Sequence, residues 1–114
     1  MVRHLMKLQP QYFDLMDEEV KIYEVRLLDE KRQGVMIGDV IEFVKEPNLN
    51  EMIGGKVQEI LKFSSFEQMA KNLPARELGF EGKSKQEIEE IYHKFYSRED
   101  EIKYGVVAFK IKKL

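Results

Sequence analysis

Residues 21–26 place three charged side chains among β-branched and aromatic neighbours, in a stretch whose composition is otherwise typical of a β-strand. Side chains of a strand point alternately to its two faces. Glu24 and Arg26 therefore share one face, whereas Lys21 falls on the other. Two interpretations follow. Glu24 and Arg26 form a surface ion pair worth roughly 0–1 kcal/mol, or they form the polar floor of a binding site.

Length and charge limit the classes of protein that this chain can belong to. Its 114 residues, 43% of them hydrophobic, suit one domain over residues 1–114, because domains of roughly 100–150 residues bury a single core. The 19 basic and 21 acidic residues nearly cancel, so no net field would hold a long nucleic-acid backbone. There is no cysteine, which excludes disulfides and thiolate sites and fits a reducing interior.

The sequence gives little reason to expect a metal, a cofactor or a membrane. His4 and His93, the two histidines, lie far apart in the chain, so we expect no metal site and no cofactor. No apolar run approaches the roughly 20 residues of a membrane span, and the N-terminus lacks the apolar stretch of a signal peptide. We therefore expect a cytoplasmic protein that does not contact membranes, and we favour a monomer.

Hydrophobic periodicity predicts four strands and one helix in the first half of the chain. The predicted strands cover residues 3–8, 21–27, 40–44 and 56–63, and the predicted helix covers residues 10–19. Residues 29–38 are predicted to be a polar connection that ends in a turn. The pair Gly54-Gly55 marks either a second turn or a bulge ahead of the fourth strand.

Capping residues predict the helices of the second half. Ser64 or Ser65 can cap a helix that ends at Pro74, and Ser84 with Glu87 has the spacing of a capping box. The second of these helices carries an apolar stripe that we expect to face the core. The stripe consists of Ile88, Ile91, Tyr92 and Phe95. His93 lies just off this stripe, so we expect it in solvent.

The end of the chain predicts one more helical turn and a closing strand. Ser97 can cap the turn, and residues 104–111 have the composition of a strand on which Val107, Phe109 and Ile111 share a face. The resulting order predicts an α+β fold, in which a small sheet curls into a barrel that leaves few exposed edges. Known catalytic signatures, such as a glycine-rich phosphate loop, are missing from the sequence.

Four sequence blocks, in this order, resemble the ASCH family of the PUA-like superfamily. They are Lys21-x-x-Glu24-x-Arg26 after a short helix, Gly38-Asp39-Val40-Ile41-Glu42-Phe43, Phe63-Ser64-Ser65-Phe66-Glu67, and Tyr96-Ser97-Arg98-Glu99 leading to Lys103-Tyr104-Gly105-Val106-Val107-Ala108. The resemblance implies a PUA-like pseudo-barrel of five or six mostly antiparallel strands with helices inserted at the rim. It also implies a cleft in which RNA or a modified nucleoside binds.

The same resemblance implies which residues line that cleft. They are Lys21, Glu24, Arg26, Ser64, Ser65 and Tyr104. Glu24 could accept a hydrogen bond from an exocyclic amine, as carboxylates do from cytosine N4. A helix N-terminus at Ser64 and Ser65 could offer amide groups to an anion as well as a cap.

An enzymatic alternative comes from family members that hydrolyse N4-acetylcytidine. Their proposed catalytic set is a lysine at the position of Lys21, a threonine three residues later and a downstream glutamate. Here Glu24 replaces the threonine, and a carboxylate would act as a general base on water rather than as a nucleophile. Glu77 is the nearest match for the downstream glutamate. A third possibility is a protein-interaction module without a working site.

Strand geometry sets a condition on any joint action of Lys21 and Glu24. Strict alternation puts their side chains on opposite faces of the strand. They can meet only if Lys21 lies in the turn before the strand, or if a bulge intervenes.

Overall fold

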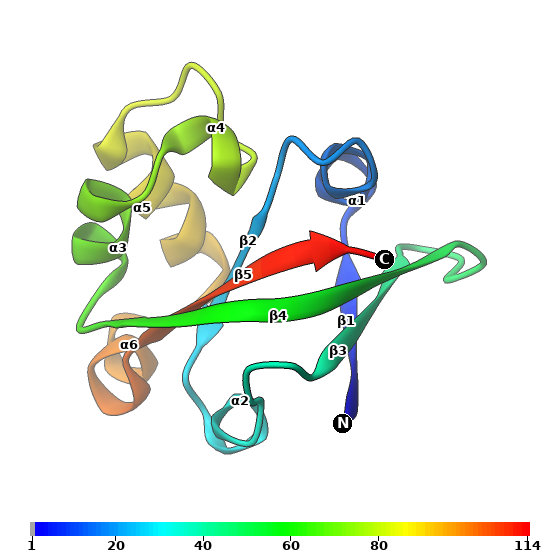
Figure 1. Cartoon of the computed structure of the whole chain (residues 1–114). Coiled ribbons are helices and arrows are strands. Elements are labelled where there is room, and N and C mark those ends of the chain that lie inside the picture. The colour runs from blue at the N-terminus through cyan, green and yellow to red at the C-terminus, as the bar shows by residue number, and fades with distance from the viewer. Residues whose placement is uncertain (1) are drawn as a thin grey trace.

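The computed structural model describes residues 2–114, which form five strands and six helices (Figure 1). In chain order the elements are β1 (Arg3–Leu8), α1 (Pro10–Asp17), β2 (Tyr23–Leu27), α2 (Glu30–Gln33), β3 (Val40–Lys45), β4 (Met52–Phe63), α3 (Phe66–Asn72), α4 (Ala75–Leu78), α5 (Lys85–Phe95), α6 (Arg98–Tyr104) and β5 (Val106–Lys113). All five predicted strands are present. None of the helices within residues 2–114 has the length and apolar character needed to cross a bilayer.

The strands form one mixed sheet in the order β1-β3-β4-β5-β2. Strands β1 and β3 run parallel, and the other three neighbouring pairs are antiparallel. The sheet curls into a half-barrel with the helices around its rim (Figure 1), so the predicted α+β class with mostly antiparallel strands is confirmed. Its edge strands, β1 and β2, approach each other closely enough for Arg26 on β2 to donate a hydrogen bond to the Lys7 carbonyl on β1.

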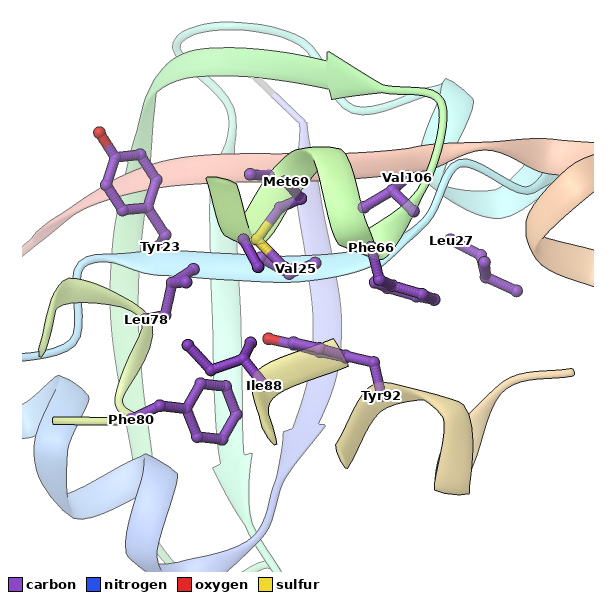
Figure 2. Packing of buried hydrophobic residues seen from close by; sticks show 12 residues of the cluster. Tyr23, Val25, Leu27, Phe66, Met69, Leu78, Phe80, Ile88, Tyr92 and Val106 are labelled. Carbon is purple, nitrogen blue, oxygen red and sulfur yellow. The ribbon is translucent and has the colours of Figure 1, made fainter. Parts of the chain in front are cut away.

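Each face of the sheet packs against its own hydrophobic core. Val107, Phe109 and Ile111 of β5 lie in the core inside the half-barrel, together with residues of β1, β3 and α1. Their predicted common face is confirmed. Val106 and Ala108 point to the other face and belong to a second core, built mainly with α3, α5 and β2 (Figure 2). Strand β5 is therefore buried on both sides and contributes side chains to both cores.

The helix starts follow their capping residues, with some corrections. Ser84 and Glu87 form the predicted capping box, and the Ser65 hydroxyl accepts the Gln68 amide at the start of α3. Two helices of four residues were not predicted: α2, which Asp29 caps, and α4, which follows Pro74. Tyr104 was predicted to open the last strand, but it ends α6.

The prediction of a turn or bulge at Gly54-Gly55 was wrong. Strand β4 runs unbroken from Met52 to Phe63, and its register irregularity lies between Val57 and Glu59. A Cβ atom on Gly55 would lie only 2.2 Å from Cγ2 of Ile111. Glycine is needed at this position because the neighbouring strand's side chain occupies the space of a Cβ.

The two adjacent glycines of β4 give a matched test of this packing. We expect Gly55→Ala to lower the free energy of unfolding by about 1–3 kcal/mol, since the added methyl overpacks against Ile111 and Phe43. A Cβ atom on Gly54 would have Leu114 Cδ1 as its nearest neighbour, at 3.5 Å. Gly54→Ala should therefore be neutral, or stabilising by up to about 1 kcal/mol. Urea unfolding of both variants measures the difference, and equal losses would contradict the packing described.

Candidate functional site

A cleft of about 390 Å³ opens beside the seam between β1 and β2, the two edge strands of the half-barrel. Lys7 and Gln9 contribute to it from the end of β1 and the residue that follows. Lys21, Glu24 and Arg26 contribute from the other side of the seam, so the structure brings these three predicted site residues together. The cleft lies where the sheet stops short of closing into a full barrel.

Glu24 forms the centre of the polar part of the cleft. Its side chain is buried, with 5% of the residue exposed. One carboxylate oxygen lies 2.6 Å from Nε of Arg26, and the other lies 3.3 Å from Nζ of Lys21. The interpretation of Glu24 and Arg26 as a solvent-exposed surface pair is therefore wrong. The two residues belong to a buried network of two cations around one anion.

Lys21 meets Glu24 because it lies ahead of the strand. Strand β2 begins at Tyr23, which satisfies the condition that Lys21 occupy the turn before it. Its ammonium is buried and donates to the carbonyl oxygens of Tyr23 and Leu78, the latter at 2.9 Å. With Glu24 as third partner, all three protons of the ammonium group are used within the protein.

Burial and charge act in opposite directions on the titration of these groups. Burial by itself raises the pKa of Glu24, but the positive charges of Arg26 and Lys21 outweigh it and lower this pKa below its ordinary value. For Lys21, burial dominates and lowers the pKa, although Glu24 opposes the change. Burial by itself lowers the pKa of the Arg26 guanidinium, but the negative charge of Glu24 outweighs burial and raises this pKa. Glu24 is thus an ionised carboxylate at neutral pH.

The short helix α4 fixes the position of Lys21. Its last residue, Leu78, supplies a carbonyl to the ammonium, and Gly79 follows with a φ of +93°. A Cβ on Gly79 would lie 3.1 Å from Cδ of Lys21 and 3.4 Å from the ring of Tyr12. Glycine thus both permits the left-handed turn and leaves room for the lysine side chain.

Aromatic side chains form the apolar wall of the cleft. They are Tyr12, Phe80, Tyr92, Phe95 and Tyr96. The rings of Phe80 and Tyr92 meet edge to face at 5.7 Å, and Phe66 stacks on Tyr92 from the core side at 4.8 Å (Figure 2). Burial raises the pKa of Tyr92 well above its ordinary value and also raises that of Tyr96, so both phenols stay protonated at neutral pH.

Phe95 differs from the prediction made for the stripe of its helix. The stripe was expected to face the core, and Ile88 and Tyr92 do so. Phe95, at the last position of α5, is 56% exposed and lines the cleft. A large exposed aromatic ring at the rim of a polar cleft is available for stacking with a ligand.

Four of the predicted site residues do not line this cleft. Ser64 is exposed in the turn after β4, and Ser65 is occupied as the cap of α3. Glu77 lies on α4, where its backbone carbonyl accepts a hydrogen bond from the Ile22 amide. The Tyr104 hydroxyl lies 3.5 Å from the carboxylate of Glu30.

His93 is not in solvent as predicted. Its Nε2 atom lies 2.8 Å from a carboxylate oxygen of Glu101, a buried residue whose other oxygen accepts the Phe66 amide. The pair ties α5 and α6 to the start of α3. Within residues 2–114, no group of three or more histidine or acidic side chains is arranged to hold a metal ion.

Comparisons with known proteins show the family and the fold of this chain. The sequence model of the ASCH domain family matches residues 6–114. Hypothetical protein PH0355 is 34% identical, with a TM-score of 0.89 over 99% of this chain and 100% of its own. Protein PF0455 from Pyrococcus furiosus is also 34% identical. Its structure gives a TM-score of 0.74, and the alignment covers 99% of this chain and 98% of PF0455.

A more distant structure shares the fold alone. The ASCH mutant protein of Zymomonas mobilis, ZmASCH, is 13% identical, with a TM-score of 0.66 over 96% of this chain and 67% of its own. A comparison with curated proteins gave no significant match.

Burial of the Glu24 network predicts a large cost when its anion is removed. We expect Glu24→Ala to lower the free energy of unfolding by about 3–5 kcal/mol, because Lys21 and Arg26 would keep buried charges without a counter-ion. Glu59→Ala is the matched control, since Glu59 forms an exposed cross-strand pair with Lys110 at 3.2 Å and should cost about 0–1 kcal/mol. Chemical denaturation at pH 7 measures both, and similar small losses would contradict a buried network.

The lowered pKa of Glu24 also predicts how this cost varies with pH. A carboxyl group whose pKa is lower in the folded state stabilises the fold fully above its unfolded value, here 4.5. That contribution is lost as the pH falls below 4.5 and through the folded pKa. The difference in unfolding free energy between wild type and Glu24→Ala should therefore shrink as the pH is lowered below 4.5. A difference that stays constant down to pH values of about 3 would contradict the assignment.

Proposed function

Since the chain belongs to the ASCH domain family, we propose that its cleft binds a nucleobase, presented by a nucleoside or by single-stranded RNA. One observation carries the proposal: a buried, ionised carboxylate stands inside a cleft that is walled by aromatic rings. The volume of about 390 Å³ lies in the usual range for small-molecule sites, about 300–1,000 Å³.

Glu24 would recognise the polar edge of the base. Each carboxylate oxygen has two acceptor positions, and the contacts with Lys21 and Arg26 use one position on each oxygen. The remaining positions can accept from an exocyclic amine such as cytosine N4. Lys21 and Arg26 would keep the carboxylate ionised and fixed in orientation, so little reorganisation would accompany binding.

The aromatic wall would hold the faces of the base. Stacking of a base on an aromatic side chain contributes about 1–3 kcal/mol, and Phe95 offers the most accessible ring. The net charge of −2 favours a nucleoside or a few nucleotides over a long duplex. The proposed contacts are thus Glu24, Arg26 and Phe95, with Tyr12 and Tyr96 beside them.

An amidohydrolase acting on an N4-acylated cytidine-like nucleoside is the second candidate. Burial lowers the pKa of Lys21 beside a carboxylate in the cleft, which is a feature of many catalytic lysines. Two observations favour binding over this reaction. The Lys21 ammonium has no free proton to donate to a substrate, and Glu77 lies outside the cleft.

Replacing the exposed aromatic ring tests the binding proposal without disturbing the core. We expect Phe95→Ala to weaken the binding of cytidine or a short single-stranded RNA roughly 5- to 150-fold, which corresponds to the loss of one stacked ring. Ile102→Ala is the matched control, because Ile102 is an exposed apolar residue on α6, away from the cleft. NMR titration of isotope-labelled protein gives both affinities, and equal affinities in the two variants would contradict the proposal.

The same titrations separate the candidates. Binding of cytidine but not of uridine supports recognition of the exocyclic amine by Glu24, and affinity for RNA that falls steeply with salt supports a strand ligand. Release of acetate from N4-acetylcytidine, abolished by Lys21→Ala, would favour the amidohydrolase. No binding of any of these compounds would contradict both candidates.

A further inference from the structure

A second surface with its own chemistry lies on the outer face of the sheet, across β1, β3 and the first half of β4. The register places side chains of these strands in rows. Leu5, Glu42 and Gly54 form one row, and Val44 and Met52 belong to the next. Leu114 lies over Gly54, since its Cδ1 is 3.5 Å from where a Cβ would be. We call Leu5, Glu42, Met52, Leu114, Arg3, Lys7, Lys56 and Lys112 the outer patch.

The middle of the outer patch is largely apolar and open, with Glu42 between Leu5 and Gly54. Leu5 is 54% exposed, Met52 57% and Leu114 70%. Val40 and Val44, on the same face, are buried, yet neither belongs to the two hydrophobic cores. A cluster of aliphatic side chains on an otherwise charged surface is typical of interaction sites.

The rim of the outer patch is cationic. It carries Arg3, Lys7, Lys56 and Lys112. Glu42, the single acidic residue of the patch, lies inside this rim and contacts Arg3 at 3.7 Å. Within residues 2–114, the three lysines form no ion pair. This excess of cations stands out in a chain whose net charge is −2.

Two of these lysines oppose each other directly. Lys56 on β4 and Lys112 on β5 are register partners, so their side chains lie side by side on one face. Like charges at such positions destabilise a sheet. An anionic group bound between them would remove the repulsion.

We propose that the outer patch is a docking surface for an acidic, amphipathic segment of a partner protein. Carboxylates of the segment would pair with Lys56, Lys112 and Lys7, and its apolar side chains would cover Leu5 and Met52. The cationic rim favours a segment with acidic side chains. The largely aliphatic centre requires that the same segment also carry apolar side chains.

Other occupants fit the outer patch less well. A nucleic-acid backbone would neutralise the lysines but leave the aliphatic centre uncovered. A second copy using the same face in a two-fold arrangement would bring the lysines of both copies together. A membrane surface is disfavoured because the patch contains no aromatic residue of the kind enriched at membrane interfaces.

Selection from a random peptide library displayed on phage tests the proposal with the whole chain as bait. Peptides that combine Asp or Glu with Leu, Ile or Phe should be enriched. A synthetic copy of an enriched peptide should shift the amide resonances of Leu5, Met52 and Lys56, whereas a scrambled peptide of identical composition should bind more weakly.

Charge reversal then links binding to the rim. The double variant Lys56→Glu with Lys112→Glu should bind the selected peptide at least about tenfold more weakly. Lys62→Glu with Lys83→Glu is the control, since both lysines are exposed, lie outside the patch and form no ion pair within the described chain. Lys112→Glu alone should melt no lower than wild type, because it replaces the repulsion with an attraction.

Three results would overturn the proposal. The selection could enrich no acidic peptides, or the selected peptides could shift the resonances of cleft residues such as Glu24 and not those of the outer patch. The rim and control variants could also lose the same amount of affinity. Binding of the outer patch to phosphatidylglycerol vesicles or to a single-stranded RNA oligonucleotide in preference to the peptide would assign it to another ligand. Concentration-dependent dimers that dissociate on Met52→Glu would assign it to a second copy.

Discussion

The contact between the Glu24 carboxylate and two buried cations joins the parts of the fold that create the cleft. Lys21 ties the turn before β2 to α4 through the Leu78 carbonyl, and Arg26 ties β2 to β1 through the Lys7 carbonyl. Buried ion networks seldom add net stability compared with apolar packing of the same volume, although breaking one is costly. Keeping three charged groups here therefore makes most sense for a site that uses the carboxylate.

The position of the cleft follows from the incomplete closure of the sheet. Exposed strand edges invite pairing with other chains, and proteins protect them with charges, helices or closure. In this chain the edge strands β1 and β2 approach without pairing, and a side-chain hydrogen bond from Arg26 bridges them. The cleft lies next to this bridge, and α5 supplies two rings of its aromatic wall, Tyr92 and Phe95. One guanidinium thus both protects the edge and contributes to the site.

Local signals in the sequence predicted much of this arrangement. The strands, the Ser84 capping box and the common face of Val107 and Phe109 each depend on residues close together in the chain, as does the grouping of Glu24 with Arg26. The four-residue helices α2 and α4 are too short to show periodicity, and Gly55 looks like a turn residue until its contact with Ile111 is known. The aromatic wall combines residues that are far apart in the sequence, from Tyr12 to Tyr96. Its residues on α5 have the spacing of core residues, so the sequence pattern does not distinguish them from the core. Ser64, Ser65 and Tyr104 were grouped with the cleft by resemblance, and their tertiary positions lie elsewhere.

Recognition of a base by Glu24 is the central claim, and carbon-detected NMR of its side-chain carboxyl during titration with cytidine tests it most directly. The account predicts that this resonance shifts together with the backbone amides of Arg26 and Tyr96, and that it responds much less to uridine. A Glu24 carboxyl that stays unchanged while cytidine shifts resonances elsewhere would contradict the account.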